Sequence, residues 1–194
     1  MSAQIISGTE LAASIRETIA KRAAELTALG HQPGLAVVLV GEDPASQVYV
    51  RNKVSACEKA GFKSVMHRMP ENTSQDALVG LVEQLNDDPT IHGILVQLPL
   101  PKHLDSHLVI ESISAEKDVD GFHPVNLGRL VQAREDCLIP CTPNGVMHIL
   151  DWAGITTASK TALVIGRSRN VGMPMAILLA SRGADATVTV AHSK

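Results

Sequence analysis

The arrangement of apolar runs along the chain limits its fold more than any other feature. Residues 34–41 and 91–101 are continuous apolar runs, and residues 62–70 between them have the composition of a strand. Amphipathic segments predict helices at about 46–60 and 74–87. Continuous apolar runs are typical of strands that are buried on both faces of a parallel sheet. The order strand, helix, strand, helix, strand therefore predicts an α/β domain with a largely parallel sheet.

The last third of the chain predicts a second domain. A helix expected at 103–114 is followed by an irregular segment at 118–145 that is rich in Pro, Gly and Asn. A helix at 144–153 then precedes a strand, a Gly turn, a helix and a strand, which form one βαβ unit. We therefore assign 1–143 to the first domain with its connecting segment, and 144–194 to part of a Rossmann-type domain. Because a nucleotide-binding sheet normally has more than two strands, we expect the chain to be cut short inside this domain.

Composition and charge exclude several classes of function. The formal net charge is -3 and aromatic residues make up 2% of the chain, so neither nucleic acid nor a membrane surface is an expected partner. No apolar run approaches the ~18–20 residues of a membrane span, and the N-terminus lacks a signal-peptide pattern. Three cysteines without a paired spacing indicate reduced thiols, and they do not suggest a metal site. We expect a cytoplasmic protein without a metal.

Tyr49 and Lys53 are the first candidates for chemistry. They are four residues apart in a predicted helix, where side chains at i and i+4 lie on one face. A phenol and an ammonium that project together suit proton transfer, because each group can tune and orient the other. The same Tyr-x-x-x-Lys spacing occurs in short-chain dehydrogenases. In those enzymes, however, the pair follows the Gly-rich nucleotide motif, whereas here it precedes it by more than a hundred residues.

The segment VIGRSRNVGMP at 164–174 predicts a phosphate-binding turn. Gly166 ends a strand and Gly172 lies near the start of a helix, so backbone amides could approach a phosphate there. Arg167 comes directly after the strand and could pair with the 2′-phosphate of NADP. Ser193 occupies the place at the end of the next strand where NAD-binding proteins commonly have an acidic residue. These features favour NADP over NAD, with a tight turn and a solvated Arg167 as the alternative.

Polar candidate residues lie within and after the apolar run at 91–101. Gln97 is placed at the carboxyl end of a predicted buried strand, the edge at which ligands bind in open α/β sheets. Asp118 and Asp120 lie in the Gly/Pro loop KDVDGFHPVN, where carboxylates can bind the N–H donors of a ligand. For Asp118, a role in capping backbone amides within a turn is the better interpretation.

Five motifs occur in a fixed order along the chain: VGEDPASQVYVRNKVSACEKAGF, GILVQLPLP, KDVDGFHPVN, PCTPNGV and VIGRSRNVGMP. Together they resemble the methylenetetrahydrofolate dehydrogenase/methenyltetrahydrofolate cyclohydrolase family over essentially the whole sequence. The resemblance implies a folate-binding first domain, an NADP-binding second domain and a homodimer formed through the cofactor domains. It implies oxidation of 5,10-methylenetetrahydrofolate with NADP, and hydrolysis of the 5,10-methenyl product to 10-formyltetrahydrofolate. The family continues past Lys194 with a further loop and a final helix.

The resemblance also implies roles for individual residues. Lys53 matches the catalytic lysine, Tyr49 its partner over the folate, and Gln97 the glutamine that hydrogen-bonds the lysine. Asp120 matches the carboxylate that binds the N–H groups of the pterin ring. Positions that contact the cofactor, together with the two glycines of the turn, are Gly166, Arg167, Ser168, Arg169, Val171, Gly172 and Ser193.

Two other functions remain open from the sequence. A two-domain dehydrogenase of the shikimate or amino-acid type would share the architecture, although not the pair of motifs GILVQLPLP and KDVDGFHPVN. A truncated and inactive fragment that retains folate binding is the alternative that involves no catalysis.

Overall fold

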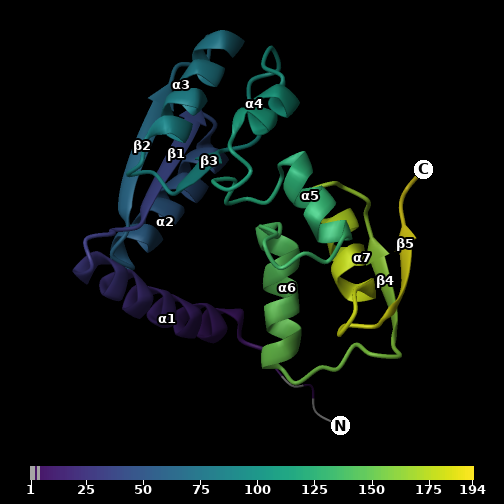
Figure 1. Cartoon of the computed structure of the whole chain (residues 1–194). Coiled ribbons are helices and arrows are strands. Elements are labelled where there is room, and N and C mark those ends of the chain that lie inside the picture. The colour runs from purple at the N-terminus through teal and green to yellow at the C-terminus, as the bar shows by residue number, and fades with distance from the viewer. Residues whose placement is uncertain (1–2, 4) are drawn as a thin grey trace. The chain divides into compact units, whose positions relative to one another are not determined.

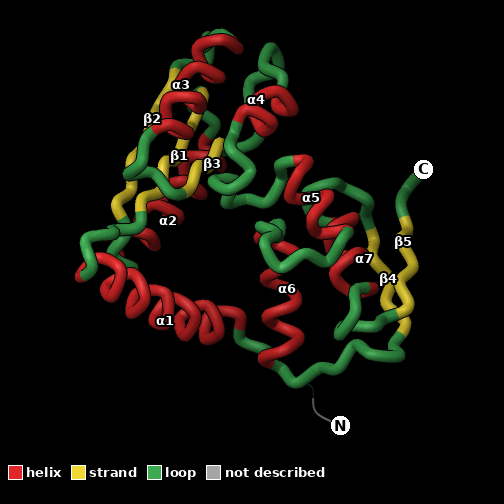
Figure 2. Tube along the Cα trace, viewed as in Figure 1, coloured by secondary structure: helices red, strands yellow, loops and turns green. Residues whose placement is uncertain are grey.

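The structure is a computed structural model that describes residue 3 and residues 5–194 (Figures 1 and 2). The chain divides into two compact units. One consists of Ser14–Val119, and the other of Asp120–Lys194 with the described residues up to Ala13. The predicted domain boundary at 143/144 differs from this geometric division and stays a prediction.

The unit Ser14–Val119 contains a parallel sheet of three strands in the order β2-β1-β3. The strands are β1 (Gly34–Val40), β2 (Lys63–Met69) and β3 (Gly93–Val96). In the central strand, Val37 is in register with Met66 of β2 and with Leu95 of β3. The parallel α/β sheet predicted from the apolar runs is therefore confirmed. The third predicted strand is wrong beyond Val96, because Pro99 and Pro101 lack the amide that a ladder requires.

Helices cover both faces of this sheet. Helix α2 (Pro44–Lys59) packs its Val50 against Val37 and Leu39 of β1. Helices α3 (Gln75–Asp87) and α4 (Ser106–Ser112) pack against the alternate side chains of the same strand, such as Val38. Val37, Val38 and Val50 are fully buried. Because successive residues of a strand point to opposite faces, β1 contributes to two separate hydrophobic clusters.

Helix α1 (Gly8–Ala28) precedes this sheet and buries only Ala23. Of the helices formed by the described residues, none combines the length and the apolar composition needed to cross a membrane.

The other unit contains helices α5 (Pro124–Val131) and α6 (Cys141–Trp152), then strand β4 (Thr161–Ile165), helix α7 (Gly172–Ala180) and strand β5 (Thr187–Ala191). Strands β4 and β5 pair in parallel, so the predicted βαβ unit is confirmed. Helix α7 packs against both strands and buries its apolar side chains there.

The prediction of an irregular segment over 118–145 is wrong, because it contains α5 and the first turn of α6. Pro124 is in the first turn of α5, where its missing amide costs no hydrogen bond. The Val125 amide donates to Nδ1 of His123 at 3.1 Å, which caps the helix. A proline directly after a capping residue was the sequence signal for this helix.

Asn86 links α3 to the end of α4. Its Nδ2 donates to the Ser112 carbonyl at 2.7 Å, and its Oδ1 accepts from the Ser114 amide at 2.8 Å. The side chain therefore satisfies one acceptor at the end of α4 and one donor of the backbone that follows it.

We expect Asn86→Ala to lower the free energy of unfolding by about 1–3 kcal/mol, because two partly buried backbone groups lose their partner. Urea unfolding followed by far-UV circular dichroism measures the change. Asn52→Ala is the matched control, since Asn52 is exposed on α2, and should stay within about 0.5 kcal/mol of wild type. Equal stability of Asn86→Ala and wild type would contradict this role.

Candidate active site

Helix α2, which carries two of the predicted catalytic residues, begins with a well-formed cap. The Asp43 carboxylate accepts from the Ser46 amide at 2.7 Å, and Pro44 lies in the first turn. Hydrogen bonds from the Ser46 amide, and then from its hydroxyl, hold the pKa of Asp43 below its ordinary value. The start of the helix is thereby fixed next to the carboxyl end of β1.

The two faces of α2 differ in burial. Ser46 and Val50 are buried against the sheet, whereas Tyr49 is 64% exposed and Lys53 is half-buried. Tyr49 and Lys53 are four residues apart in one continuous helix, so they lie on the same side of it. This placement agrees with the predicted pair and leaves the phenol ring accessible to a ligand.

Gln97 brings the end of β3 into contact with Lys53. The Lys53 Nζ donates to the Gln97 Oε1 at 3.4 Å. The Gln97 Nε2 donates to the Leu98 carbonyl at 2.7 Å, and the Gln97 amide donates to the Val38 carbonyl at 2.9 Å. The bond to Leu98 leaves the side-chain oxygen facing the lysine. The structure thus brings together two predicted residues that are 44 positions apart in sequence.

The segment that leads to Asp120 runs beside β3. The Ile94 amide donates to the Lys117 carbonyl at 2.7 Å, and Asp118 forms a parallel bridge with Ile94. Asp118 is 2% exposed, in agreement with a structural role. Asp120 follows directly after Val119, the last residue of this unit, and is grouped with the other unit. Its role toward a ligand stays a prediction.

The turn between β4 and α7 has the backbone geometry of a close approach. Gly166 has φ +117°, a conformation that favours glycine. The backbone of Gly166 occupies the space that a side chain at residue 172 would need, so only glycine fits there. The Ser168 Oγ accepts from the amides of Val171 and Gly172 at 3.2 and 3.3 Å. Two amides at the N-terminus of α7 therefore point to one oxygen, which is the geometry that suits a phosphate oxygen.

Arg167 and Ser193 follow neighbouring strands. Because Ile165 is in register with Ala191, Arg167 and Ser193 come two residues after the same paired position, at the carboxyl edge of the sheet. Both residues are exposed, and so is Arg169. The predicted cofactor residues are thus gathered at the β4–α7 turn and the end of β5, and their contacts with a cofactor stay predictions.

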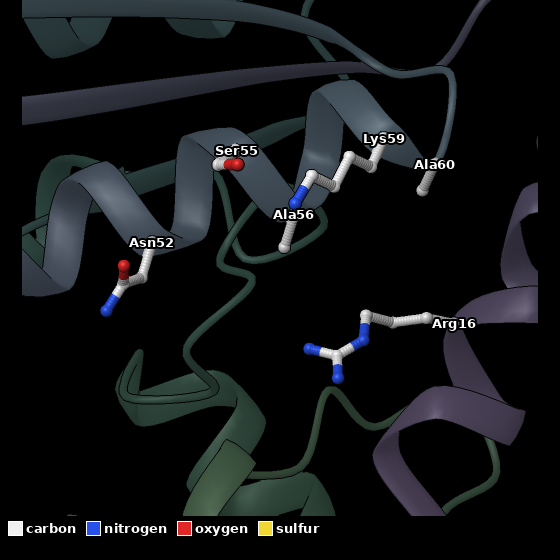
Figure 3. A pocket seen from close by; sticks show the side chains of 6 residues that line it. All are labelled: Arg16, Asn52, Ser55, Ala56, Lys59 and Ala60. Carbon is white, nitrogen blue, oxygen red and sulfur yellow. The ribbon is translucent and has the colours of Figure 1, made fainter. Parts of the chain in front are cut away.

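A hollow of about 540 Å³ lies beside another face of α2 and is shown in Figure 3. The residues that line it are Arg16, Asn52, Ser55, Ala56, Lys59 and Ala60. None of the predicted catalytic residues is among them. In the described part of the chain, no group of three or more His, Cys, Asp and Glu residues could hold a metal ion.

Comparison with family models identifies the class of protein. Residues 140–194 match the NAD(P)-binding domain of tetrahydrofolate dehydrogenase/cyclohydrolase, which makes the β4–α7–β5 unit part of an NAD(P)-dependent enzyme fold. Residues 6–120 match the catalytic domain of the same family. The chain belongs to the tetrahydrofolate dehydrogenase/cyclohydrolase family.

Individual relatives agree with this assignment. The bifunctional protein FolD of Bordetella avium is 58% identical over 194 residues, which are 100% of this chain and 67% of the relative. The FolD crystal structure from Campylobacter jejuni matches with a TM-score of 0.97 at 46% identity, over 100% of this chain and 68% of that one. The Trypanosoma brucei enzyme, solved with NADP and an inhibitor, matches with a TM-score of 0.94 at 38% identity, over 99% and 65%. Neither alternative function left open by the sequence is favoured by these matches.

Two polar side chains have structural roles that the sequence did not reveal. Lys117 donates to backbone carbonyls at the end of α3, and Ser168 accepts from the first amides of α7 from within the turn. Ser168 lies four residues before the start of α7, outside the N-cap position at Val171, so the usual capping signal does not indicate it. For Lys117, the partners are 29 to 32 residues away, so no local pattern could have indicated them.

Asp43 gives a pH prediction for the stability of α2. Because its pKa is lowered in the folded protein, its stabilisation is present above the unfolded pKa of about 3.9 and is lost as the pH falls through the folded value. Asparagine caps equally well and does not titrate. We expect wild type to be more stable than Asp43→Asn at pH 6, because the charged carboxylate also interacts favourably with the dipole of α2. This difference in stability should close below about pH 4.

Urea midpoints measured by circular dichroism between pH 6 and pH 3 would test this expectation. Glu42→Gln is the control, because Glu42 precedes the capping residue and takes no part in the cap of α2. Wild type and Asp43→Asn should converge as the pH falls. Parallel curves for these two proteins over the whole range would contradict the assignment.

Proposed function

We propose that this protein catalyses both reactions of its family, with Lys53 as the group that handles protons. The reactions are oxidation of 5,10-methylenetetrahydrofolate with NADP and hydrolysis of 5,10-methenyltetrahydrofolate to 10-formyltetrahydrofolate. The observation that carries the proposal is the contact of the Lys53 Nζ with the Gln97 Oε1 at 3.4 Å, at the carboxyl end of a parallel strand. Ligands of open α/β sheets bind at this edge.

In the oxidation, the residues of the chain bind and align the two reactants. NADP, when bound, supplies the chemistry by accepting the hydride from the methylene bridge. The amides of Val171 and Gly172, which donate to the Ser168 Oγ, would bind a phosphate oxygen of the cofactor at the N-terminus of α7. Arg167 and Ser193 would bind its 2′-phosphate. Tyr49 packs against the folate, and Asp120 accepts from the N–H groups of the pterin ring. Correct alignment of the reacting carbons is the main contribution of the protein.

In the hydrolysis, Lys53 transfers protons. Water adds to the carbon of the methenyl bridge, and the Lys53 amine takes the proton that the water loses. The same proton is then returned to the folate nitrogen as its bond to the bridge carbon breaks. The hydroxyl of the water adduct releases its own proton to solvent as the formyl C=O forms, so the formyl group stays on the other nitrogen and one proton is released overall. The Gln97 Oε1 accepts one N–H of the amine and so orients it toward the water. Such general acid–base help is typically worth about 10²–10⁴-fold in rate.

The setting of the enzyme is part of the proposal. We infer a cytoplasmic enzyme of one-carbon metabolism that acts as a homodimer, assembled through the cofactor domains. The net charge of -3 supports the absence of nucleic acid or membrane lipid among its partners. Sedimentation velocity of the purified chain tests the dimer.

Lys53→Met should abolish the cyclohydrolase activity, by at least about 10²-fold in kcat, and leave the dehydrogenase activity detectable. The substitution keeps the length of the side chain and removes the proton-transfer group. Two assays give the answer: NADP reduction at 340 nm, and decay of the methenyl absorbance. Lys59→Met on the exposed side of α2 is the control and should match wild type in both. Equal loss of both activities in Lys53→Met would show that Lys53 only positions the substrate.

Arg167→Gln should weaken NADP binding by about tenfold or more while NAD binding changes little, because hydrogen bonds to charged groups are worth about 1.5–3 kcal/mol each. Isothermal titration with each dinucleotide measures the ratio. Arg182→Gln is the control, since Arg182 is an exposed arginine after the opposite end of α7. A proportional loss of NAD and NADP affinity would exclude a role of Arg167 at the 2′-phosphate.

A further inference from the structure

Lys117 makes an unusual set of contacts for a lysine outside the proposed catalytic group. Its Nζ donates to the carbonyls of Leu85, Asn86 and Asp88 at 3.1, 2.6 and 3.0 Å. These carbonyls end α3, where backbone acceptors lack partners within the helix. A positive charge at this end is also favoured by the helix dipole. All three donor positions of the ammonium are therefore used by one helix terminus.

The backbone around Lys117 is held as firmly as its side chain. The Lys117 carbonyl accepts from the Ile94 amide at 2.7 Å, and the Lys117 amide donates to the Ser114 carbonyl at 2.8 Å. Asp118 then bridges to Ile94. At Gly93, a side chain would collide with Val119, so this segment lies directly against β3.

These contacts surround the three residues that precede Asp120. The segment is tied to α3 through the Lys117 ammonium and to β3 through backbone bonds on the edge opposite β1. Asp118 and Val119 leave no flexible linker between this anchor and Asp120, because one is paired with β3 and the other packs against it. The backbone on the N-terminal side of Asp120 is thus held by the anchor at Lys117.

We propose that Lys117 is a positioning residue for folate binding, which acts by fixing the segment that presents Asp120. The inference rests on the proposed function, in which Asp120 binds the pterin ring. Lys117 itself does not touch the substrate. Removing its ammonium takes a donor from three carbonyls at the end of α3, of which that of Asp88 still accepts from the Ile91 amide, and releases the start of the segment from the helix. Asp120 then samples several positions, of which only one binds folate, so folate affinity falls.

The test compares Lys117→Met with wild type by isothermal titration with 5-formyltetrahydrofolate, a folate without a bridge that can react. We expect about tenfold weaker binding of this folate and a change of less than about twofold in NADP binding. Lys117→Arg restores donors to the carbonyls and should recover most of the affinity. Lys63→Met is the matched control, because the Lys63 Nζ donates to one exposed hydroxyl, that of Thr90 at 2.9 Å. It should bind folate as wild type does.

Hydrogen exchange of backbone amides supplies a second readout that does not need a ligand. In Lys117→Met, residues 118–121 should exchange faster than in wild type, beyond any change in the rest of α3. If Lys117→Met fails to fold, Lys117→Gln carries the same comparison with one donor retained.

The outcomes separate the inference from the proposed function. Unchanged folate affinity in folded Lys117→Met, or an equal loss of folate and NADP affinity, overturns the positioning role. Wild type that binds no folate refutes the proposed function instead. In that case unchanged exchange at 118–121 would overturn the anchoring by Lys117, and faster exchange there would support it.

Discussion

Burial of β1 on both faces is the constraint on which the site of this protein depends. Val37 and Leu39 pack toward α2, and Val38 packs toward α3 and α4. Since α2 must turn Val50 to this strand, the side that carries Tyr49 and Lys53 is left outside the core. The same strand binds the Gln97 amide through the Val38 carbonyl. The contact between Lys53 and Gln97 is therefore a consequence of how one apolar strand is covered.

Hydrogen bonds at helix ends hold segments that the hydrophobic core does not fix. Asp43 caps the start of α2, and Lys117 binds the carbonyls at the end of α3. Both bonds are charge-assisted, which makes them stronger than neutral ones, although Asp43 is exposed and Lys117 is half-buried. Each holds a segment adjacent to a strand end, where the predicted site residues lie. The hydrophobic core thus determines which face of α2 is exposed. The hydrogen bonds at the helix termini determine how rigidly the segments next to the strand ends are held.

The sequence allowed prediction of features whose cause is local. The apolar run at 34–41 sufficed for β1, because burial on two faces leaves a direct trace in composition. For β2, the strand-like composition of 62–70 was the signal. Helix α5 is absent from the prediction because Pro and Gly indicate an irregular segment, although Pro124 after His123 is a helix start. The bond from Lys53 to Gln97 spans 44 positions, and only family resemblance connected the two residues. Lys117 has partners 29 to 32 positions away and no motif of its own, so its role became visible only in the structure.

Ser168 shows how a turn can be ordered before its ligand arrives. The amides of Val171 and Gly172, which are proposed to bind a phosphate oxygen, already donate to its hydroxyl oxygen. A phosphate at this place would replace one acceptor by another, so the net change in hydrogen-bond energy is small compared with forming the bonds from solvated amides. The hydroxyl can then rotate and donate to the phosphate, because it is both an acceptor and a donor. Together with Gly172, where only glycine fits, the serine keeps the backbone close to its binding geometry, and less ordering is required when the cofactor binds.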